Sequence, residues 1–191
     1  MSEFLTINTG SSSPIKQETI NPLKLFNEDL PMLKSVMPHY NVLDLPNSKM
    51  NELVAKLKMT MKLYGGIGLS ANQCGVQERV FVIGTDYFQM VCINPKIIDK
   101  SDEVERVKEG CLTYPGLYVT VPRYKWVEVE FFTEMGEKKQ IRLDGLTAQC
   151  FQHELDHMNG ITFTSLVGPV ALQLAKQKQQ KLIKKVKKLN R

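Results

Sequence analysis

The sequence predicts an α+β domain in which β-strands surround a buried helix that carries an H-E-x-x-H motif, followed by a C-terminal helix. Three observations support this class: a segment with helical periodicity, a run of β-rich segments in the middle of the chain, and a helix near residue 150 that is apolar around most of its circumference. We expect residues 1–20 to form a flexible arm, residues 21–168 the main domain, and residues 169–191 a basic helix.

The composition is typical of a soluble globular protein. The 191 residues are 42% hydrophobic and 24% charged, and no apolar run approaches the roughly 20 residues of a membrane span. The N-terminus lacks the basic and apolar regions of a secretory signal, and the four cysteines are widely spaced in a chain too long for a disulfide scaffold. We therefore expect a cytoplasmic protein with reduced cysteines and no membrane contact.

Charge is distributed unevenly along the chain. The formal net charge is +5, but eight basic residues and no acidic residue lie between Lys176 and Arg191. The first 175 residues hold 17 basic and 20 acidic side chains, so the body of the protein is slightly acidic. This asymmetry favours a docking tail over a nucleic-acid-binding body, and we expect no specific DNA partner.

The N-terminal third is expected to contain an extended segment and a helix. Prolines at positions 22, 31, 38 and 46 predict an extended segment wrapped over a core. Residues 48–64 place apolar side chains at helical spacing, and the glycines at 65 and 66 end this helix. The next stretch, residues 66–73, reads by itself as a turn, because its glycines permit a tight path or close approach to a ligand.

Strands are expected in the middle of the chain. The β-rich segments are residues 79–83, 90–93, 96–98, 118–121, 126–132 and 139–143, with a further short strand at 161–163. Asn94-Pro95 is expected to interrupt the run between the second and third segments. Gly136, in a short polar connection, predicts a hairpin between residues 126–132 and 139–143.

The helix expected at residues 144–159 organises the rest of the chain. It begins after a plausible N-cap and ends at an Asn-Gly pair. Because residues i and i+4 lie on one face of a helix, His153 and His157 can bind the same metal ion. Glu154 then lies where its carboxylate can take a proton from water that the metal activates.

Two histidines make an incomplete site, since a catalytic ion usually has three protein ligands. Metalloproteases with this motif take the third ligand from a downstream His or Glu, but residues 158–191 contain no His, Glu or Asp. Cys111, in the glycine-flanked and irregular stretch 109–116, is the best candidate, because a thiolate binds such ions well. The alternative is that Cys111 is a small buried hydrophobe, as we expect of the other three cysteines.

Three segments together resemble the signature motifs of the peptide deformylases, in order and in spacing. They are residues 66–73 (GIGLSANQ), 109–113 (EGCLT) and 153–157 (HELDH). The resemblance extends over about residues 22–168. Ser70, Asn72 and Thr113 depart from the usual pattern, and none of them removes a group that the reaction needs.

The resemblance implies a hydrolase that removes the N-formyl group from N-formylmethionine of newly synthesised polypeptides. It implies three ligands for one divalent ion, Cys111, His153 and His157, with Fe²⁺ as the native metal and Zn²⁺, Ni²⁺ or Co²⁺ as substitutes. Glu154 would deprotonate the attacking water and later protonate the leaving amine. The Gln73 side chain and the Leu112 N–H would stabilise the oxyanion.

The resemblance also implies how formylated nascent peptides are bound. The expected substrate-binding residues are Ile67, Gly68, Gly110, Leu146 and Cys150. The backbones of the first three would pair with the peptide as an added strand does, and the methionine side chain would enter an apolar pocket. An ion pair between Glu109 and Arg123 is expected to support the Cys111 loop; two unrelated solvated charges are the alternative.

The basic tail resembles that of bacterial members, in which a C-terminal helix docks on the ribosome. The lysines expected to take part are Lys181, Lys184, Lys185, Lys187 and Lys188. The alternative is a solvated, frayed helix end. Deletion of residues 176–191 is expected to weaken ribosome binding and to spare hydrolysis of a formyl-Met peptide.

Two other functions compete with a deformylase. A metalloendopeptidase would need a downstream ligand that the sequence lacks. A non-catalytic ribosome- or RNA-binding module on the same fold would not need the intact ligands, Glu154 or Gln73. Release of formate from a formyl-Met peptide, without cleavage of an internal peptide bond, would distinguish the deformylase from both.

Overall fold

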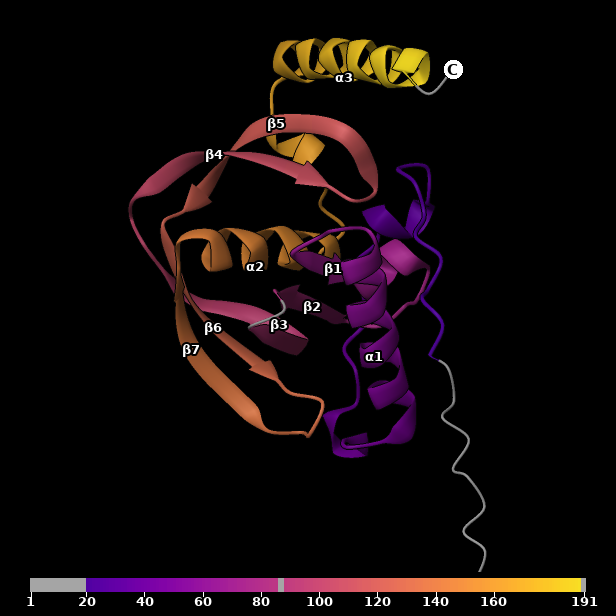
Figure 1. The fold of residues 1–191 in the computed structure, drawn as a ribbon. Helices are drawn as coiled ribbons and strands as arrows, with labels where there is room; N and C mark the ends of the chain where they lie inside the picture. Colours follow the sequence, from indigo (N-terminus) through magenta and orange to yellow (C-terminus); the bar gives the residue numbers. More distant parts are fainter. Residues whose placement is uncertain (1–19, 86–87, 190–191) are drawn as a thin grey trace, which may run out of the picture.

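The computed structural model describes residues 20–85 and 88–189, which form an α+β structure as predicted (Figure 1). A five-stranded antiparallel sheet has the order β1-β2-β3-β6-β7, and a second sheet pairs β4 with β5. The strands of the larger sheet are β1 (Gly68–Ser70), β2 (Val80–Gly84), β3 (Gln89–Lys100), β6 (Trp126–Phe132) and β7 (Lys138–Asp144). The smaller sheet contains β4 (Val104–Cys111) and β5 (Tyr114–Tyr124). The α-helices of this part are α1 (Ser48–Leu63), α2 (Gly145–Met158) and α3 (Pro169–Leu189).

The segment before α1 is extended over the core, as predicted from its prolines. It contains two short 3₁₀ helices, Pro31–Lys34 and Val42–Asp44, and is otherwise irregular. The Phe26 N–H donates to the Gln73 carbonyl at 3.0 Å, which ties the segment to the first motif. The predicted N-terminal arm lies outside the described residues, apart from its last residue.

Helix α1 agrees with the prediction from its apolar spacing. The Asn47 side chain accepts a hydrogen bond from the Met50 N–H at 2.8 Å, so it caps the first turn. The buried face packs on β1 and β2 through Met50, Val54, Leu57 and Met61. Gly65, with φ of 67°, ends the helix in the left-handed region, where glycine is favoured.

Strand β3 is continuous, although two strands separated by Asn94-Pro95 were predicted. The register with β6 shifts between Ile93 and Lys96, which marks a bulge. Asn94 has φ of 51°, and its side-chain amide exchanges two hydrogen bonds of 2.8 Å with the Tyr40 backbone. The Asn-Pro pair therefore bends the strand without ending it, because the side chain compensates for the interrupted ladder.

Two further predictions were wrong. The stretch around Cys111 is not an irregular loop: Glu109, Gly110 and Cys111 end β4, and β5 begins at Tyr114. The short strand predicted at residues 161–163 does not form: residues 161 and 162 are irregular, and a 3₁₀ helix, Phe163–Leu166, begins at the third residue. Phe163 is buried there with its ring in edge contact with Tyr114, and this packing overrides its β-propensity.

Helix α2 lies between the two sheets, with β4 and β5 on one side and the larger sheet on the other (Figure 1). It extends from the predicted N-cap Asp144 to the predicted end at Asn159, and nine of its 14 residues are buried. Phe151 packs edge-to-face against Phe81 of β2, with ring centroids 5.2 Å apart. The helix has little contact with water because both of its broad faces pack on strands.

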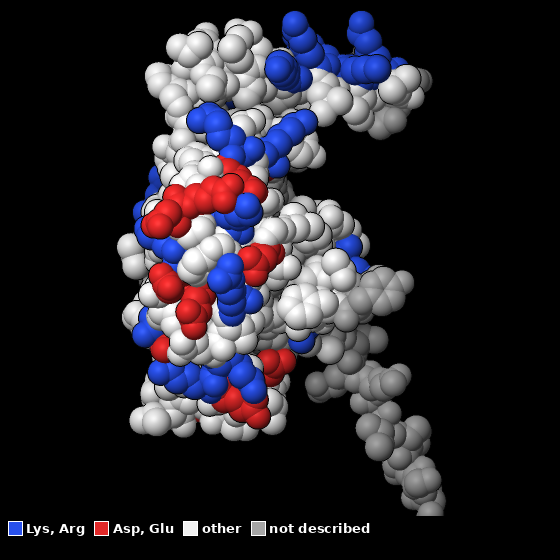
Figure 2. Space-filling model, turned by 90° about the vertical axis from the view of Figure 1, so that its left-hand side faces the viewer, with Lys and Arg blue, Asp and Glu red and all other residues white. Residues whose placement is uncertain are grey.

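Helix α3 crosses the outer side of the β4–β5 hairpin (Figure 1). Leu172 and Ala175 pack partly on the cluster around Tyr114, and the Gln179 side chain donates to the Pro115 carbonyl at 2.8 Å. None of the 21 residues of α3 is buried. Figure 2 shows basic side chains projecting from this helix, whereas acidic and basic side chains are mixed over the sheets. Within the described residues, no helix is long and apolar enough to cross a membrane.

Candidate metal centre and pocket

The end of β4 and one face of α2 bring the three predicted ligands together. Donor atoms of Cys111, His153 and His157 all lie within 4.8 Å of one another, and theirs is the one such group found in the described part of the chain. The Cys111 Sγ lies 3.4 Å from the His157 Nε2. One thiolate and two imidazoles with converging donors fit a first-row divalent cation and leave room for a further ligand.

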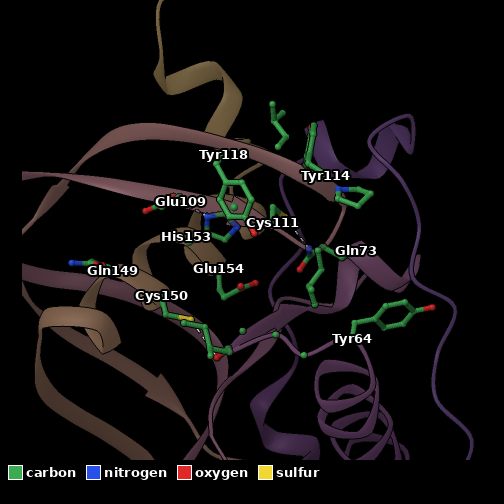
Figure 3. A pocket seen from close by; sticks show the side chains of 18 of the residues that line it. Tyr64, Gln73, Glu109, Cys111, Tyr114, Tyr118, Gln149, Cys150, His153 and Glu154 are labelled. Carbon is green, nitrogen blue, oxygen red and sulfur yellow. Dashed lines mark hydrogen bonds and ion pairs between the residues drawn. The ribbon is translucent and has the colours of Figure 1, made fainter. Parts of the chain in front are cut away.

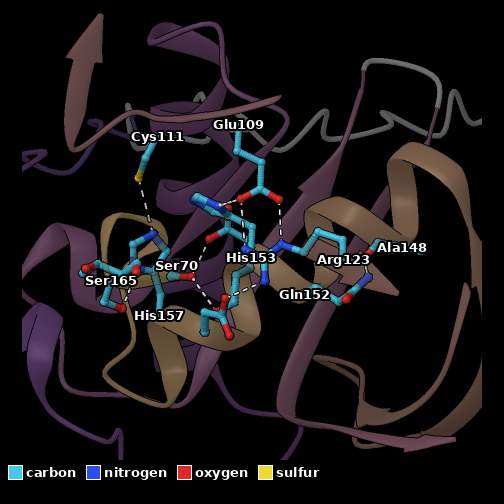
Figure 4. A network of polar contacts seen from close by, with 12 residues as sticks. Ser70, Glu109, Cys111, Arg123, Ala148, Gln152, His153, His157 and Ser165 are labelled. Carbon is cyan, nitrogen blue, oxygen red and sulfur yellow. Dashed lines mark hydrogen bonds and ion pairs between the residues drawn. The ribbon is translucent and has the colours of Figure 1, made fainter. Parts of the chain in front are cut away.

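A buried ionic network orients the first histidine (Figure 4). The His153 Nδ1 lies 3.0 Å from the Glu109 Oε2. Arg123, which is 5% exposed, donates to both Glu109 oxygens at 2.6 and 2.9 Å and to Asp156 at 2.6 Å. The predicted Glu109–Arg123 ion pair is therefore confirmed, and Asp156 is a third member that the sequence did not indicate. The network leaves the His153 Nε2 available to a cation, as is usual for metal-binding histidines.

The pKa shifts of this network support its ionic character. Burial acts to raise the pKa of Glu109, but its hydrogen bonds with Arg123 and His153 hold that pKa below its usual value. For His153, burial acts to lower the pKa, yet hydrogen bonds with Cys111 and Glu109 raise it well above the usual range. The site thus favours a positive charge at His153, and a metal cation can take the place of the proton.

His157 has a different environment. Burial lowers the pKa of His157 well below its usual range, so its imidazole is neutral, which is the form that binds metals. Its Nδ1 is buried and has no hydrogen-bond partner in the described part of the chain. The Asn72 side chain donates to the His157 carbonyl at 2.7 Å, and thereby links the first motif to the end of α2.

Glu154 extends from α2 toward the floor of the cavity (Figure 3). It is 3% exposed, and its Oε2 accepts a hydrogen bond of 2.5 Å from the Ser70 hydroxyl. Burial raises the pKa of Glu154, partly offset by the charge of His153 and by the Ser70 hydrogen bond. A buried carboxylate with a raised pKa binds a proton more readily than a free one, as a group that exchanges protons needs.

Gln73 reaches the same centre from the first motif. The predicted turn at residues 66–73 instead contains β1 and the start of a 3₁₀ helix, Ala71–Cys74. The Ser70 N–H donates to the Gln73 Oε1 at 2.9 Å, and the Gln73 Nε2 donates to the Thr113 hydroxyl at 2.9 Å. The Nε2 also lies 3.3 Å from the Cys111 Sγ. These contacts orient the amide so that its donor end faces the candidate ligands.

A cavity of about 490 Å³ opens beside this centre (Figure 3). Every predicted substrate-binding residue lines it: Ile67, Gly68, Gly110, Leu146 and Cys150. Gln73, Leu112 and Glu154 line it as well. Of the three candidate ligands, Cys111 and His153 contribute to the lining and His157 does not. Leu146 is 63% exposed, so it stands at the rim of the cavity although most of α2 is buried.

Sequence reasoning missed the wall that β5 contributes. Tyr114, Pro115, Gly116, Leu117 and Tyr118 line the cavity, and Tyr64, Lys108 and Gln149 also contribute to its lining. Tyr118 stands over Gly110, where an added Cβ would meet its ring at 2.7 Å. The glycines on both sides of the hairpin tip could have indicated a backbone that approaches a ligand.

The remaining cysteines behave as predicted. Cys74, Cys92 and Cys150 are free and buried. Burial raises the pKa of Cys74 to about 12, and it raises the pKa values of the other two well above the usual range. They are therefore protonated thiols that pack as small apolar groups, and Cys150 presents such a group to the cavity.

Comparison with known proteins assigns this architecture to one family. The family model described as polypeptide deformylase matches residues 22–171. A peptide deformylase of Prochlorococcus marinus (strain NATL1A) is 41% identical over 121 residues, which are 61% of this chain and 60% of that relative. One from Aquifex aeolicus is 39% identical over 147 residues, with 74% and 86% covered. The matched region thus spans about 60% of the length of the Prochlorococcus relative.

Solved structures agree with the fold and with the family. A peptide deformylase from Synechococcus elongatus in complex with actinonin has a TM-score of 0.78 at 32% identity, covering 83% of this chain and 88% of that one. One from Legionella pneumophila has a TM-score of 0.77 at 31% identity, with 85% and 96% covered.

Proposed function

This chain belongs to the polypeptide deformylase family, and we propose that it removes the N-formyl group from formylmethionine at the start of newly made polypeptides. The observation that supports this most strongly is one arrangement: the Cys111, His153 and His157 donors converge beside a cavity that Gln73 and Glu154 also face. A peptidase of the ordinary H-E-x-x-H type would use a different third ligand.

The proposed reaction is hydrolysis of the formyl amide. A bound divalent cation would lower the pKa of a water molecule and polarise the formyl oxygen. Glu154 accepts a proton from the attacking water as the C–O bond forms, and it delivers that proton to the amine nitrogen as the C–N bond breaks. The products are formate and a peptide with a free N-terminus.

Charge that develops on the formyl oxygen needs donors from the chain. The Gln73 Nε2 is held toward Cys111, and the Leu112 N–H follows Cys111 directly, so we propose both as oxyanion donors. In comparable sites one such donor contributes about 2.7–4 kcal/mol. The backbones of Ile67, Gly68 and Gly110, which line the cavity, would pair with the substrate main chain, and Leu146 and Cys150 would contact the methionine side chain.

The native metal and the cellular partners are further parts of the proposal. We propose Fe²⁺ as the resident ion and Zn²⁺, Ni²⁺ or Co²⁺ as functional substitutes; a thiolate with two imidazoles suits all four. We also propose that the enzyme acts in the cytoplasm and that the basic α3 docks on the ribosome through phosphate contacts. The lysine-rich, exposed character of α3 supports that docking.

One assay tests the central proposal. Protein prepared anaerobically and loaded with Fe²⁺, Ni²⁺ or Co²⁺ is incubated with formyl-Met-Ala-Ser and, separately, with a peptide blocked at both ends. Formate release from the first and no cleavage of the second is the expected result. Cleavage of the blocked peptide would support an endopeptidase, and no turnover with any of the three ions would falsify the proposal.

A further inference from the structure

Ser70 is a buried polar residue placed between the two proposed catalytic side chains. It is the last residue of β1 and is 0% exposed. Its hydroxyl donates to the Glu154 Oε2 at 2.5 Å, and its N–H donates to the Gln73 Oε1 at 2.9 Å. One residue thus fixes the acceptor end of the Gln73 amide and one oxygen of the Glu154 carboxylate.

The other oxygen of Glu154 lies next to Gly68, which lines the cavity. A Cβ added at Gly68 would meet the Glu154 Oε1 at 2.4 Å and the Cys150 Sγ at 2.7 Å. Gly68 and Ser70 are two residues apart on β1, so both face α2. The strand therefore provides an open space for Oε1 at one residue and a donor for Oε2 at the other.

The hydrogen bond to one oxygen of Glu154 restricts the rotation of the whole carboxylate. The terminal torsion of a Glu side chain is broad, so a carboxylate held at one end only can rotate. The Ser70 hydroxyl opposes that rotation, because a buried Oε2 without a donor would be costly. The peptide N–H of the same residue holds the Gln73 amide, which places its Nε2 toward the candidate ligands.

We propose that Ser70 is a positioning residue that aligns Glu154 and Gln73 on either side of the reacting carbonyl, with Oε1 as the oxygen that exchanges the proton. This rests on the function proposed above, because only a reaction at the cavity makes the alignment consequential. Ser70 is neither a lining residue of the cavity nor one of the candidate ligands. It acts through the two side chains that it holds.

A merely structural role for Ser70 makes a different prediction. Ser70 also begins the 3₁₀ helix that follows, where its side chain accepts from the Gln73 N–H. If capping were its whole role, loss of the hydroxyl would lower stability and would weaken substrate binding and turnover together. If Ser70 positions Glu154, turnover should fall while binding and metal content are kept.

The test compares Ser70→Ala with the unaltered full-length enzyme and with Ser101→Ala. Ser101 is a matched control, since it is 5% exposed and its hydroxyl forms hydrogen bonds with the Glu103 and Lys125 backbones, in the connection between β3 and β4. Each protein is loaded with Co²⁺, and four quantities are measured: metal content, thermal unfolding, kcat and KM for formyl-Met-Ala-Ser, and the Kd of the product peptide Met-Ala-Ser.

Ser70→Ala should lower kcat by about tenfold or more, as small misplacements of reacting groups do, with KM and the product Kd within about twofold. Ser70→Thr, which keeps the hydroxyl, should recover most of the lost kcat. Ser70→Gly also removes the hydroxyl, together with Cβ. It replaces the alanine variant if that protein loses metal or unfolds at a lower temperature.

An unchanged kcat in the variants without the hydroxyl would overturn the proposal, and so would equal losses in kcat and in peptide affinity, or a loss that Ser101→Ala reproduces. These outcomes differ from failure of the proposed function. In that case the unaltered enzyme itself would release no formate.

Discussion

Helices α2 and α3 follow each other closely in the chain but have opposite environments. Nine of the 14 residues of α2 are buried between the sheets, whereas none of the 21 residues of α3 is buried. Nearly every polar group on the inner faces of α2 has a partner, as the Arg123–Asp156 and Ser70–Glu154 contacts show. The lysines of α3 extend into solvent (Figure 2).

This difference fits two different roles, which are to hold reacting groups in place and to contact a partner. A buried helix holds reacting groups within the small tolerance that chemistry needs, because packing fixes their rotamers. Substitutions in an exposed basic helix change the free energy of unfolding little, and its side chains are available to a polyanionic partner. Substitutions should therefore have large effects on α2 and its contacts, and small and selective ones on α3.

The largest effect is expected from the reactive face of α2. Glu154→Ala should lower kcat/KM for formyl-Met-Ala-Ser by about 10²–10⁴, because the proposed general acid–base is lost. Metal content, measured by elemental analysis, should stay near that of the unaltered enzyme.

Cys111→Ala, at the end of β4, should instead lose the metal as well as the activity, since one of three converging donors is gone. Retention of full metal by the Cys111 variant would contradict the proposed ligand set.

The next effect concerns stability. Arg123→Met should lower the free energy of unfolding by about 3–5 kcal/mol, because the largely buried Asp156 loses its partner and Glu109 keeps only its contact with His153. Urea denaturation monitored by circular dichroism measures this change. Lys125→Met is the control, since its ion pair with Glu103 is exposed, and it should change stability little. Equal losses in the two variants would mean that burial of the network is unimportant.

A smaller effect is expected where α3 contacts the hairpin. Gln179→Ala should raise KM about two- to fivefold with kcat unchanged, because its hydrogen bond to the Pro115 carbonyl supports one wall of the cavity. Gln180→Ala on the exposed side of α3 is the control. Deletion of residues 176–191 removes the same contact, so turnover at saturating formyl-Met peptide should be spared, as the sequence predicts, while KM should rise as it does in Gln179→Ala. An unaltered KM in the deleted protein would show that the wall needs no support from α3.

The smallest effect on the enzyme itself should come from the tail lysines. Replacing Lys184, Lys185, Lys187 and Lys188 by Gln should leave unfolding and formate release unchanged. Co-sedimentation with ribosomes should weaken, and the dependence of binding on salt should become less steep, because fewer phosphate contacts release counterions. Binding that is unchanged at every salt concentration would count against docking through α3.

The sequence predicted what depends on local pattern. The boundaries of α1 and α2 followed from apolar spacing and capping residues, and three separated motifs predicted a metal group whose donors the fold brings within 4.8 Å. Strand β4 was missed because its residues alternate between half-buried and exposed positions with charged side chains on both faces. Its pairing with β5 supplies the order that its own sequence does not specify.

The parts of the site that could not be predicted depend on long-range contacts. Nothing near Asp156 in the chain indicates Arg123 as its partner, and the cavity wall of β5 exists only because the hairpin folds over α2. Ser70 was recognised as a departure from the family pattern. Its hydrogen bond with Glu154, 84 residues away, is a long-range contact that the sequence pattern does not indicate.

The contact between Gln179 and Pro115 has a consequence for the encounter with a growing chain. Through this contact α3 is joined to Pro115, which lines the cavity. A large partner that bound α3 would therefore also fix the orientation of the cavity entrance relative to itself. A tethered N-terminus would then meet the pocket at a local concentration set by the length of exposed chain and independent of the bulk peptide.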